Sequence, residues 1–428
     1  MNKLLIGVVL MAGLILSLFL AVTLKYDPDQ VQMLTKGMAL AFHGIWTPYG
    51  NAVTGGGFLP GGLLTGLTGI PLLIWDQALA PQLFIILLHL CGVYLFDRAL
   101  RDYFTPMQRF VFFCLIWLTP WRIGHSVLWN PSYLFFIAAV HFYTASKLAN
   151  RSSTSACKAF FLSFFHVLII GLAFQVHASA VILVIISAYL GVGRYIKCNW
   201  LGVASAIVVV LCSLIPYFLA MQQDVSASDT DTTGINSFYG YGLVNIYPML
   251  KALLYWPRYT STIIPERLFS GLSVTTYPVL TLLYYVLGII SMLPACWALC
   301  WFLGKATRAG KSLFTMGSCT DHYCLAAFIA LVASAALSPI NFSNWYLLLI
   351  LPAAYMVFVN FLWAKLHFLS RIQAGWILGC SCIYLVLLNI GIPFLSHRYD
   401  LSNSMVLHYP AIKAQYLGTL SEGSDQEE

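Results

Sequence analysis

Long apolar runs alternate with short polar stretches along most of the chain, and the first run is the clearest. Residues 4–24 contain no charged side chain and are flanked by Lys3 and Lys25. A helix of this length, at about 1.5 Å per residue, is long enough to cross a bilayer core of roughly 30 Å. The run is too long for a signal peptide and no small-x-small cleavage pattern follows it. We therefore predict an uncleaved anchor with its amino terminus in the cytoplasm.

Further apolar runs of similar character follow, which brings the number of predicted spans to about eleven. They cover residues 81–96, 110–120, 131–148, 159–175, 179–193, 200–221, 278–303, 323–338, 345–363 and 372–395. Three of them, at 110–120, 159–175 and 179–193, are short for a full crossing, so we expect tilted or broken helices there. An odd number of spans places the carboxyl terminus outside.

Composition and charge agree with this pattern. Hydrophobic residues make up 60% of the chain and charged residues 9%, with a mean hydropathy of +0.81. These values exclude a soluble globular protein and predict an all-α fold, a polytopic transmembrane helical bundle that forms one domain over residues 1–428. Fourteen of the 22 lysines and arginines fall in the loops predicted to face the cytoplasm, as the positive-inside rule requires. The net charge of +7 is scattered, so no nucleic-acid partner is expected.

Two outer connections, residues 25–80 and 222–277, are too long to be simple linkers. In the first, Asp29 is the predicted cap of a surface helix whose apolar residues recur at helical spacing, namely Val31, Leu34, Met38 and Ala41. The second becomes aromatic towards its end. The outer tail, residues 396–428, closes in an acidic stretch at 421–428 that we expect to be disordered.

Two aspartates follow the first span directly, in Tyr26-Asp27-Pro28-Asp29. A carboxylate at a membrane edge costs free energy unless it is solvated or has a functional role. A helix cap and a solvated loop charge would account for both without any further function. The alternative is a catalytic role for one of them.

The layout around Asp29 resembles the first outer loop of the GT-C superfamily of lipid-linked-sugar glycosyltransferases, which includes protein O-mannosyltransferases and lipid A aminoarabinose transferases. The shared features are an acidic residue after the first span, a surface helix, a Gly-x-Trp-x-x-Pro-like turn ending at Pro48 and a glycine- and proline-containing stretch at 55–63. Where the family has Pro-Pro-Leu, this chain has Pro60-Gly61-Gly62-Leu63. Segments 129–132 and 175–179 also resemble bacterial members, and the match is best over the first hundred residues.

The resemblance implies that a sugar on polyprenyl phosphate is attacked at its anomeric carbon by an acceptor hydroxyl of a lipid or surface glycan, such as lipopolysaccharide, in an inverting reaction. Asp29, or else Asp27, would be the general base. Cations and hydrogen-bond donors are expected at the donor phosphate, and the candidates are Arg258, His177, Gln175, Lys36 and Arg267. Plain interfacial anchoring is the alternative for the arginines and for His177. No metal or other cofactor is predicted, although some relatives use a divalent metal.

The second hypothesis is a transporter or flippase of a lipid-linked glycan, and the third is an O-antigen ligase or polymerase. A transporter needs polar pathways inside the membrane. His89, His141 and His166 are predicted to be isolated within spans, whereas the carboxylates gather at the outer edge, which favours chemistry there. A ligase or polymerase carries its large loop late in the chain, whereas the acidic loop here comes first. We expect a multi-pass protein of the cell inner membrane with an extracytoplasmic site.

Overall fold

The structure is a computed structural model that describes residues 3–53, 57–149, 155–222, 244–263, 277–308, 318–339, 343–366 and 368–424. The helices of the first half are α1 (Lys3–Thr23), α2 (Pro28–His43), α3 (Leu63–Ile74), α4 (Leu79–Leu100), α5 (Pro106–Leu118), α6 (Pro120–Ile123), α7 (Leu134–Ala149), α8 (Ala156–Val176) and α9 (Val181–Val192). Those of the second half are α10 (Trp200–Gln222), α11 (Ile246–Thr260), α12 (Pro278–Arg308), α13 (Cys319–Ala336), α14 (Leu351–Lys365), α15 (Arg371–Leu395) and α16 (Met405–Ser424). Three 3-10 segments, η1 (Asn130–Tyr133), η3 (Ala178–Ala180) and η8 (Asn344–Ile350), precede α7, α9 and α14.

The prediction of a polytopic helical bundle is confirmed. Most of each of the eleven apolar runs is helical, and eight helical segments in the described part of the chain are long and apolar enough to cross a membrane. Helices α5 and α9 are short, as predicted. The prediction of a short or broken helix at 159–175 is wrong, because α8 is continuous over 21 residues and already begins at Ala156. The Ser155 hydroxyl caps it by accepting from the Lys158 N–H. The number of crossings stays a prediction.

Helix α2 confirms the helix predicted after the first span but not its predicted cap, and its place on the membrane surface stays a prediction. The N-cap is Asp27, whose carboxylate accepts from the N–H groups of Asp29 (3.1 Å) and Gln30 (3.3 Å), while the Gln30 side chain accepts from the Asp27 N–H. Pro28 occupies the first helical position, where a missing N–H is not needed. The helix therefore starts two residues earlier than predicted, and Asp29 lies in its first turn.

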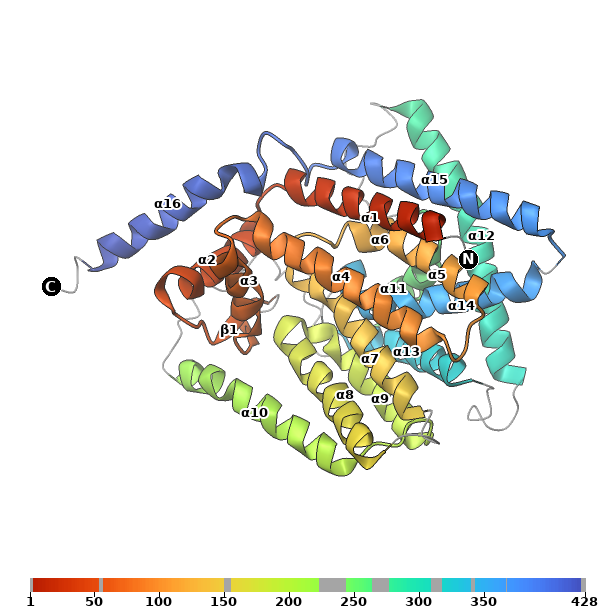
Figure 1. Cartoon of the computed structure of the whole chain (residues 1–428), viewed down its shortest axis with the longest axis horizontal. Helices are drawn as coiled ribbons and strands as arrows, with labels where there is room; N and C mark the ends of the chain where they lie inside the picture. Colours follow the sequence, from red (N-terminus) through yellow and green to blue (C-terminus); the bar gives the residue numbers. More distant parts are fainter. Residues whose placement is uncertain are drawn as a thin grey trace.

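A second helix of the first outer loop, α3, was not predicted as a separate element. It packs against α2, and the two approach closely at Gly37 and Gly69. A Cβ atom at Gly37 would lie only 2.7 Å from Cγ2 of Thr68. Strands β1 (Tyr49–Ala52) and β2 (Phe58–Pro60) form an antiparallel hairpin between the helices. Figure 1 shows α2, α3 and β1 gathered at one end of the bundle.

The carboxyl-terminal tail is helical well into the stretch predicted to be disordered, because α16 continues to Ser424. Residues 425–428 lie outside the described part of the chain. Helix α16 is docked through Asp76, which accepts a hydrogen bond from Tyr409 (2.8 Å) and pairs with Lys413. Burial alone would raise the pKa of Asp76, but the hydrogen bonds of Lys413 and Tyr409 and the charge of Lys413 together lower it. In Figure 1, α16 projects from the end of the bundle that holds α2 and α3.

The prediction that the intramembrane histidines are isolated is wrong. The rings of His141 and His166 stack with centroids 4.4 Å apart, and both Nε2 atoms contact the Ser187 hydroxyl, at 2.8 and 3.0 Å. The Nδ1 atom of His141 contacts the Tyr323 hydroxyl, and the Nδ1 atom of His166 contacts the Thr144 hydroxyl. The helices that carry these residues could not be aligned from sequence spacing alone, because the contacts join α7, α8, α9 and α13.

Candidate active site

The site begins with a contact between two segments that lie a hundred residues apart. The indole Nε1–H of Trp129 donates to the Asp29 carboxylate at 2.9 Å. Asp29 is half-buried in the first turn of α2, and Trp129 immediately precedes η1. Two of the segments that resemble GT-C proteins therefore meet at Asp29.

The third such segment joins them from α8. The Asn130 amide donates to the Val176 carbonyl at 3.1 Å, which places His177 beside the Trp129 segment. On its other side, Trp129 stacks on His125, whose Nδ1–H donates to the Trp121 carbonyl. These contacts fix the indole from several directions, so the Asp29 carboxylate meets a rigid donor.

The start of the tenth predicted span belongs to the same cluster. Segment η8 brings Trp345 to Trp129, with ring centroids 5.4 Å apart, and Tyr346 to His177, at 5.1 Å. The carbonyl of Asn344 accepts a hydrogen bond from Tyr259 of α11 at 2.8 Å. Sequence reasoning missed η8 because the apolar run hid it, although Asn344-Trp345-Tyr346 at a predicted outer edge is the composition typical of an interface.

His177 is buried and holds one defined tautomer. Its Nδ1 accepts the Ser179 backbone N–H at 3.1 Å, and therefore the ring proton of the neutral imidazole is on Nε2. Burial lowers the pKa of His177 to about 4. At neutral pH the side chain thus acts as a neutral hydrogen-bond donor rather than as a cation.

Asp27 is already engaged at this end of the bundle. One carboxylate oxygen caps α2, and the other lies 3.7 Å from the Arg398 guanidinium. Arg398, which the sequence analysis did not select, lies over the face of Trp129 at 5.1 Å from the ring centroid. No pattern in the sequence links position 398 to position 27.

Two of the predicted phosphate ligands make contacts that support the hairpin. The Lys36 ammonium donates to the Gly50 carbonyl of β1 and lies over the rings of Tyr49 and Phe58. The Gln175 amide donates to Ser213 of α10 at 2.8 Å, and its side chain occupies the space that a Cβ atom at Gly61 would need. The φ of +82° at Gly61 separately favours glycine. Their role at a phosphate stays a prediction.

Arg258 lies in the last turn of α11, with its guanidinium 5.2 Å from the ring of Tyr255. Its carbonyl accepts the Trp121 Nε1–H at 3.3 Å, and the adjacent Tyr259 reaches η8. Two aromatic side chains, Trp121 and Tyr259, thus join Arg258 to the Asp29 cluster. Arg267 lies outside the described residues, as do 223–243 and 264–276 of the second outer loop.

Comparison with known proteins identifies the fold of this chain. No protein-family model and no curated protein sequence matches the chain. Its structure is similar to that of ArnT from Cupriavidus metallidurans bound to undecaprenyl phosphate, with a TM-score of 0.52 and 14% identity over 90% of this chain and 64% of ArnT. The apo state of that protein gives 0.52 and 14% over 86% and 61%. This chain has the GT-C fold.

The GT-C similarity extends over nearly all of this chain, but the chain spans less than two thirds of the length of ArnT. Within the residues that the structure describes, no group of three histidine, cysteine or acidic side chains is arranged to hold a metal. The expectation of a reaction without a metal stays a prediction. The site described above consists of the Asp29 carboxylate, the Trp129 indole, the neutral His177 and the nearby arginines Arg258 and Arg398.

Proposed function

We propose that this protein is a glycosyltransferase that moves a sugar from a polyprenyl-phosphate donor to a hydroxyl group of an extracytoplasmic lipid or glycan. The observation that carries the proposal is the hydrogen bond between Asp29 and Trp129 at the end of a GT-C bundle. It unites the acidic residue of the first outer loop with the segments at 129–132 and 175–179. The bound undecaprenyl phosphate of the structurally similar ArnT supports the donor class.

Asp29 is the proposed general base. The acceptor hydroxyl attacks the anomeric carbon as its proton passes to Asp29, and the bond from that carbon to the phosphate oxygen breaks with inversion. Proton transfer of this kind typically contributes about 10²–10⁴-fold to the rate. Asp27 is the weaker candidate, because its carboxylate already caps α2 and faces Arg398.

The polyprenyl phosphate leaves as a monoester and gains negative charge. Groups that stabilise this charge must be in place before the bond breaks. The neutral His177 would donate through Nε2, and Arg258 would offer two parallel N–H groups to phosphate oxygens. Gln175, Lys36 and Arg267 remain further candidates for the donor phosphate.

The proposed location is the inner membrane, with the site on its extracytoplasmic side. The support comes from charge: residues at the opposite ends of the helices form ion pairs among the basic loops, such as Lys147 with Asp102 and Arg109 with Asp97. The positive-inside rule assigns such loops to the cytoplasm.

The transporter hypothesis draws on the paired histidines inside the bundle, but their contacts argue against a pathway. Thr144 donates its hydroxyl proton to backbone carbonyls of its own helix, so it accepts from His166, and the chain of hydrogen bonds ends there. A closed, internally satisfied network joins helices rather than lining a route for a substrate.

A transfer assay in detergent tests the proposal, because transport between leaflets cannot occur there. We expect solubilised protein to move label from a radiolabelled polyprenyl-phosphate sugar to a membrane glycolipid extract. Asp29→Asn should reduce the rate by at least about 100-fold while leaving the protein folded, since an amide oxygen still accepts from Trp129 but takes no proton.

Asp27→Asn is the matched control. Asparagine is as good a helix cap as aspartate, so α2 should persist and the loss of rate should be much smaller. Equal, normal rates in both variants would remove the general-base role. Absence of transfer across a panel of lipid-linked sugars, together with exchange of the donor between leaflets of reconstituted vesicles, would replace the enzyme with a transporter.

A further inference from the structure

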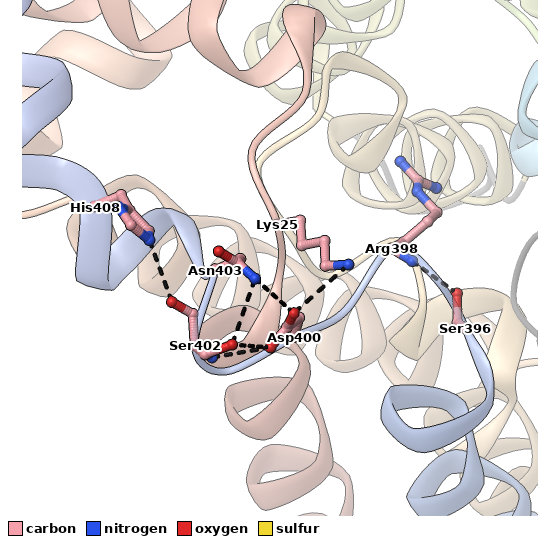
Figure 2. A network of polar contacts seen from close by, with 7 residues as sticks. All are labelled: Lys25, Ser396, Arg398, Asp400, Ser402, Asn403 and His408. Atoms are coloured by element: carbon pink, nitrogen blue, oxygen red, sulfur yellow. Dashed lines mark hydrogen bonds and ion pairs between the residues drawn. The ribbon is translucent and has the colours of Figure 1, made fainter.

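The loop between α15 and α16 is fixed to the end of α1 by main-chain hydrogen bonds. The Lys25 N–H donates to the Arg398 carbonyl at 2.9 Å, and the Asp400 N–H donates to the Thr23 carbonyl at 2.7 Å. Asp400 accepts from Ser402 and Asn403 and lies 3.7 Å from the Lys25 ammonium (Figure 2). The backbone at 398 is therefore held directly beside the start of the Asp29 loop.

The Arg398 side chain extends away from this network (Figure 2) and lies over the face of Trp129. The edge of the same indole donates to Asp29. One rigid ring thus sets the position of the proposed base and of a cation at the same time. Only 20% of the Arg398 side chain is exposed, so the guanidinium is partly desolvated where it lies.

The contact with Asp27 engages none of the hydrogen-bond donors of the Arg398 guanidinium closely. The distance of 3.7 Å to Asp27 exceeds that of a hydrogen bond, and the guanidinium makes no hydrogen bond with any residue that the structure describes. Its five N–H donors are therefore available to a ligand. Asp27 is itself 43% exposed and has one oxygen committed to the α2 cap, so this pair is weak.

We propose that Arg398 binds the phosphate of the polyprenyl donor, with the carboxyl-terminal segment thereby completing the site. The inference rests on the proposed function and adds a residue to it. A phosphate offers two oxygens to the planar fork of a guanidinium, a stronger arrangement than the loose contact with Asp27. The Trp129 indole, which donates to Asp29, also keeps the guanidinium over its ring.

Binding of undecaprenyl phosphate to the full-length protein in detergent tests this without any sugar or acceptor. Undecaprenol, which lacks the phosphate, is the reference lipid. We expect wild-type protein to prefer undecaprenyl phosphate, and Arg398→Gln to weaken its binding by roughly 10- to 100-fold, as for loss of hydrogen bonds to a charged group. Arg398→Lys keeps the charge but not the fork, so binding should fall by an intermediate factor.

Lys413→Gln is the matched control, since it removes another cation of the same segment that pairs with Asp76 instead. It should bind as wild type does. An equal loss in Lys413→Gln would overturn the inference, because docking of the segment rather than Arg398 would then be responsible. Wild-type affinity in Arg398→Gln would also overturn it and leave the proposed function intact. If wild-type protein shows no preference for undecaprenyl phosphate over undecaprenol, the proposed donor class fails as well.

Discussion

At the scale of single residues, two aspartates separated by one proline do different work. Asp27 caps a helix and faces a cation, whereas Asp29 accepts a hydrogen bond from an indole that arrives from another part of the chain. That indole belongs to the segment at 129–132, which Asn130 joins to the segment at 175–179. Chemical type and spacing alone could not separate the two.

His177 makes a prediction about pH at the same scale. Its pKa is about 4 in the folded protein and about 6.5 when unfolded, so the unfolded state binds more protons between these values. Stability should therefore fall as the pH drops below about 6.5. His177→Asn retains an acceptor for the Ser179 N–H but does not titrate. We expect this variant to lose about 1–2 kcal/mol less stability than wild type between pH 7 and pH 5.

Melting temperatures at the two pH values measure this difference, and His408→Asn, an exposed site outside the cluster, is the control. A loss on acidification that is the same in wild type and His177→Asn would contradict the assignment of a buried neutral histidine.

At the scale of elements, the position of Asp29 depends on how α2 packs against α3. The close approach at Gly37 means that even a methyl group must displace Thr68, whose side chain is itself fully buried. Helix packing of this kind explains why a loop next to the membrane can hold a carboxylate at a fixed distance from Trp129. The glycine is required for approach and not for backbone conformation.

Gly37→Ala should therefore destabilise the protein by about 1–3 kcal/mol, the usual cost of overpacking, and should reduce transfer by shifting α2. Gly7→Ala is the control, because a Cβ at that helical position meets nothing within 4 Å. Thermal unfolding and the transfer assay measure both effects. A Gly37→Ala protein as stable and as active as Gly7→Ala would show that the approach of the two helices is unimportant.

At the scale of the whole molecule, the predicted outer ends of many spans meet at one end of the bundle. Contacts join α2 with the Trp129 segment, α8, η8 and the loop after α15. A single error of sidedness in the assignment of spans would have put one of these segments at the far end. The clustering is thus independent support for the alternation of the spans, and α16 extends from the same end (Figure 1).

Cysteine labelling in intact cells checks which side of the membrane this end faces. In a background without reactive native thiols, Ile45→Cys and Leu407→Cys should react with an impermeant maleimide, since these residues are 53% and 61% exposed. Arg101→Cys, near the opposite end, should react only after permeabilisation. Labelling of Arg101→Cys in intact cells would reverse the topology.

The sequence by itself determined the elements that depend on local chemistry. Apolar runs located the long apolar helices, because uncharged stretches of spanning length have few alternatives to a helix in a membrane. The residues at 29, 129–132 and 175–179 stand out by residue type and position in the sequence, which needs no knowledge of their contacts. Three predictions are wrong, namely Asp29 as the helix cap, a short helix at 159–175 and isolated histidines, since each depends on neighbours in the sequence alone.

Only the tertiary structure decided which side chains share a space. Hydrogen bonds from Trp129 to Asp29 and from Asn130 to Val176 span 100 and 46 residues, and the pairing of Arg398 with Asp27 joins the two ends of the chain. Such contacts follow from the packing of helices whose lipid-facing and buried sides are both apolar, so hydrophobic periodicity does not reveal how the helices are rotated. For that reason the sequence predicted Asp29 and the segment at 129–132, but neither the hydrogen bond between them nor the position of Arg398 beside them.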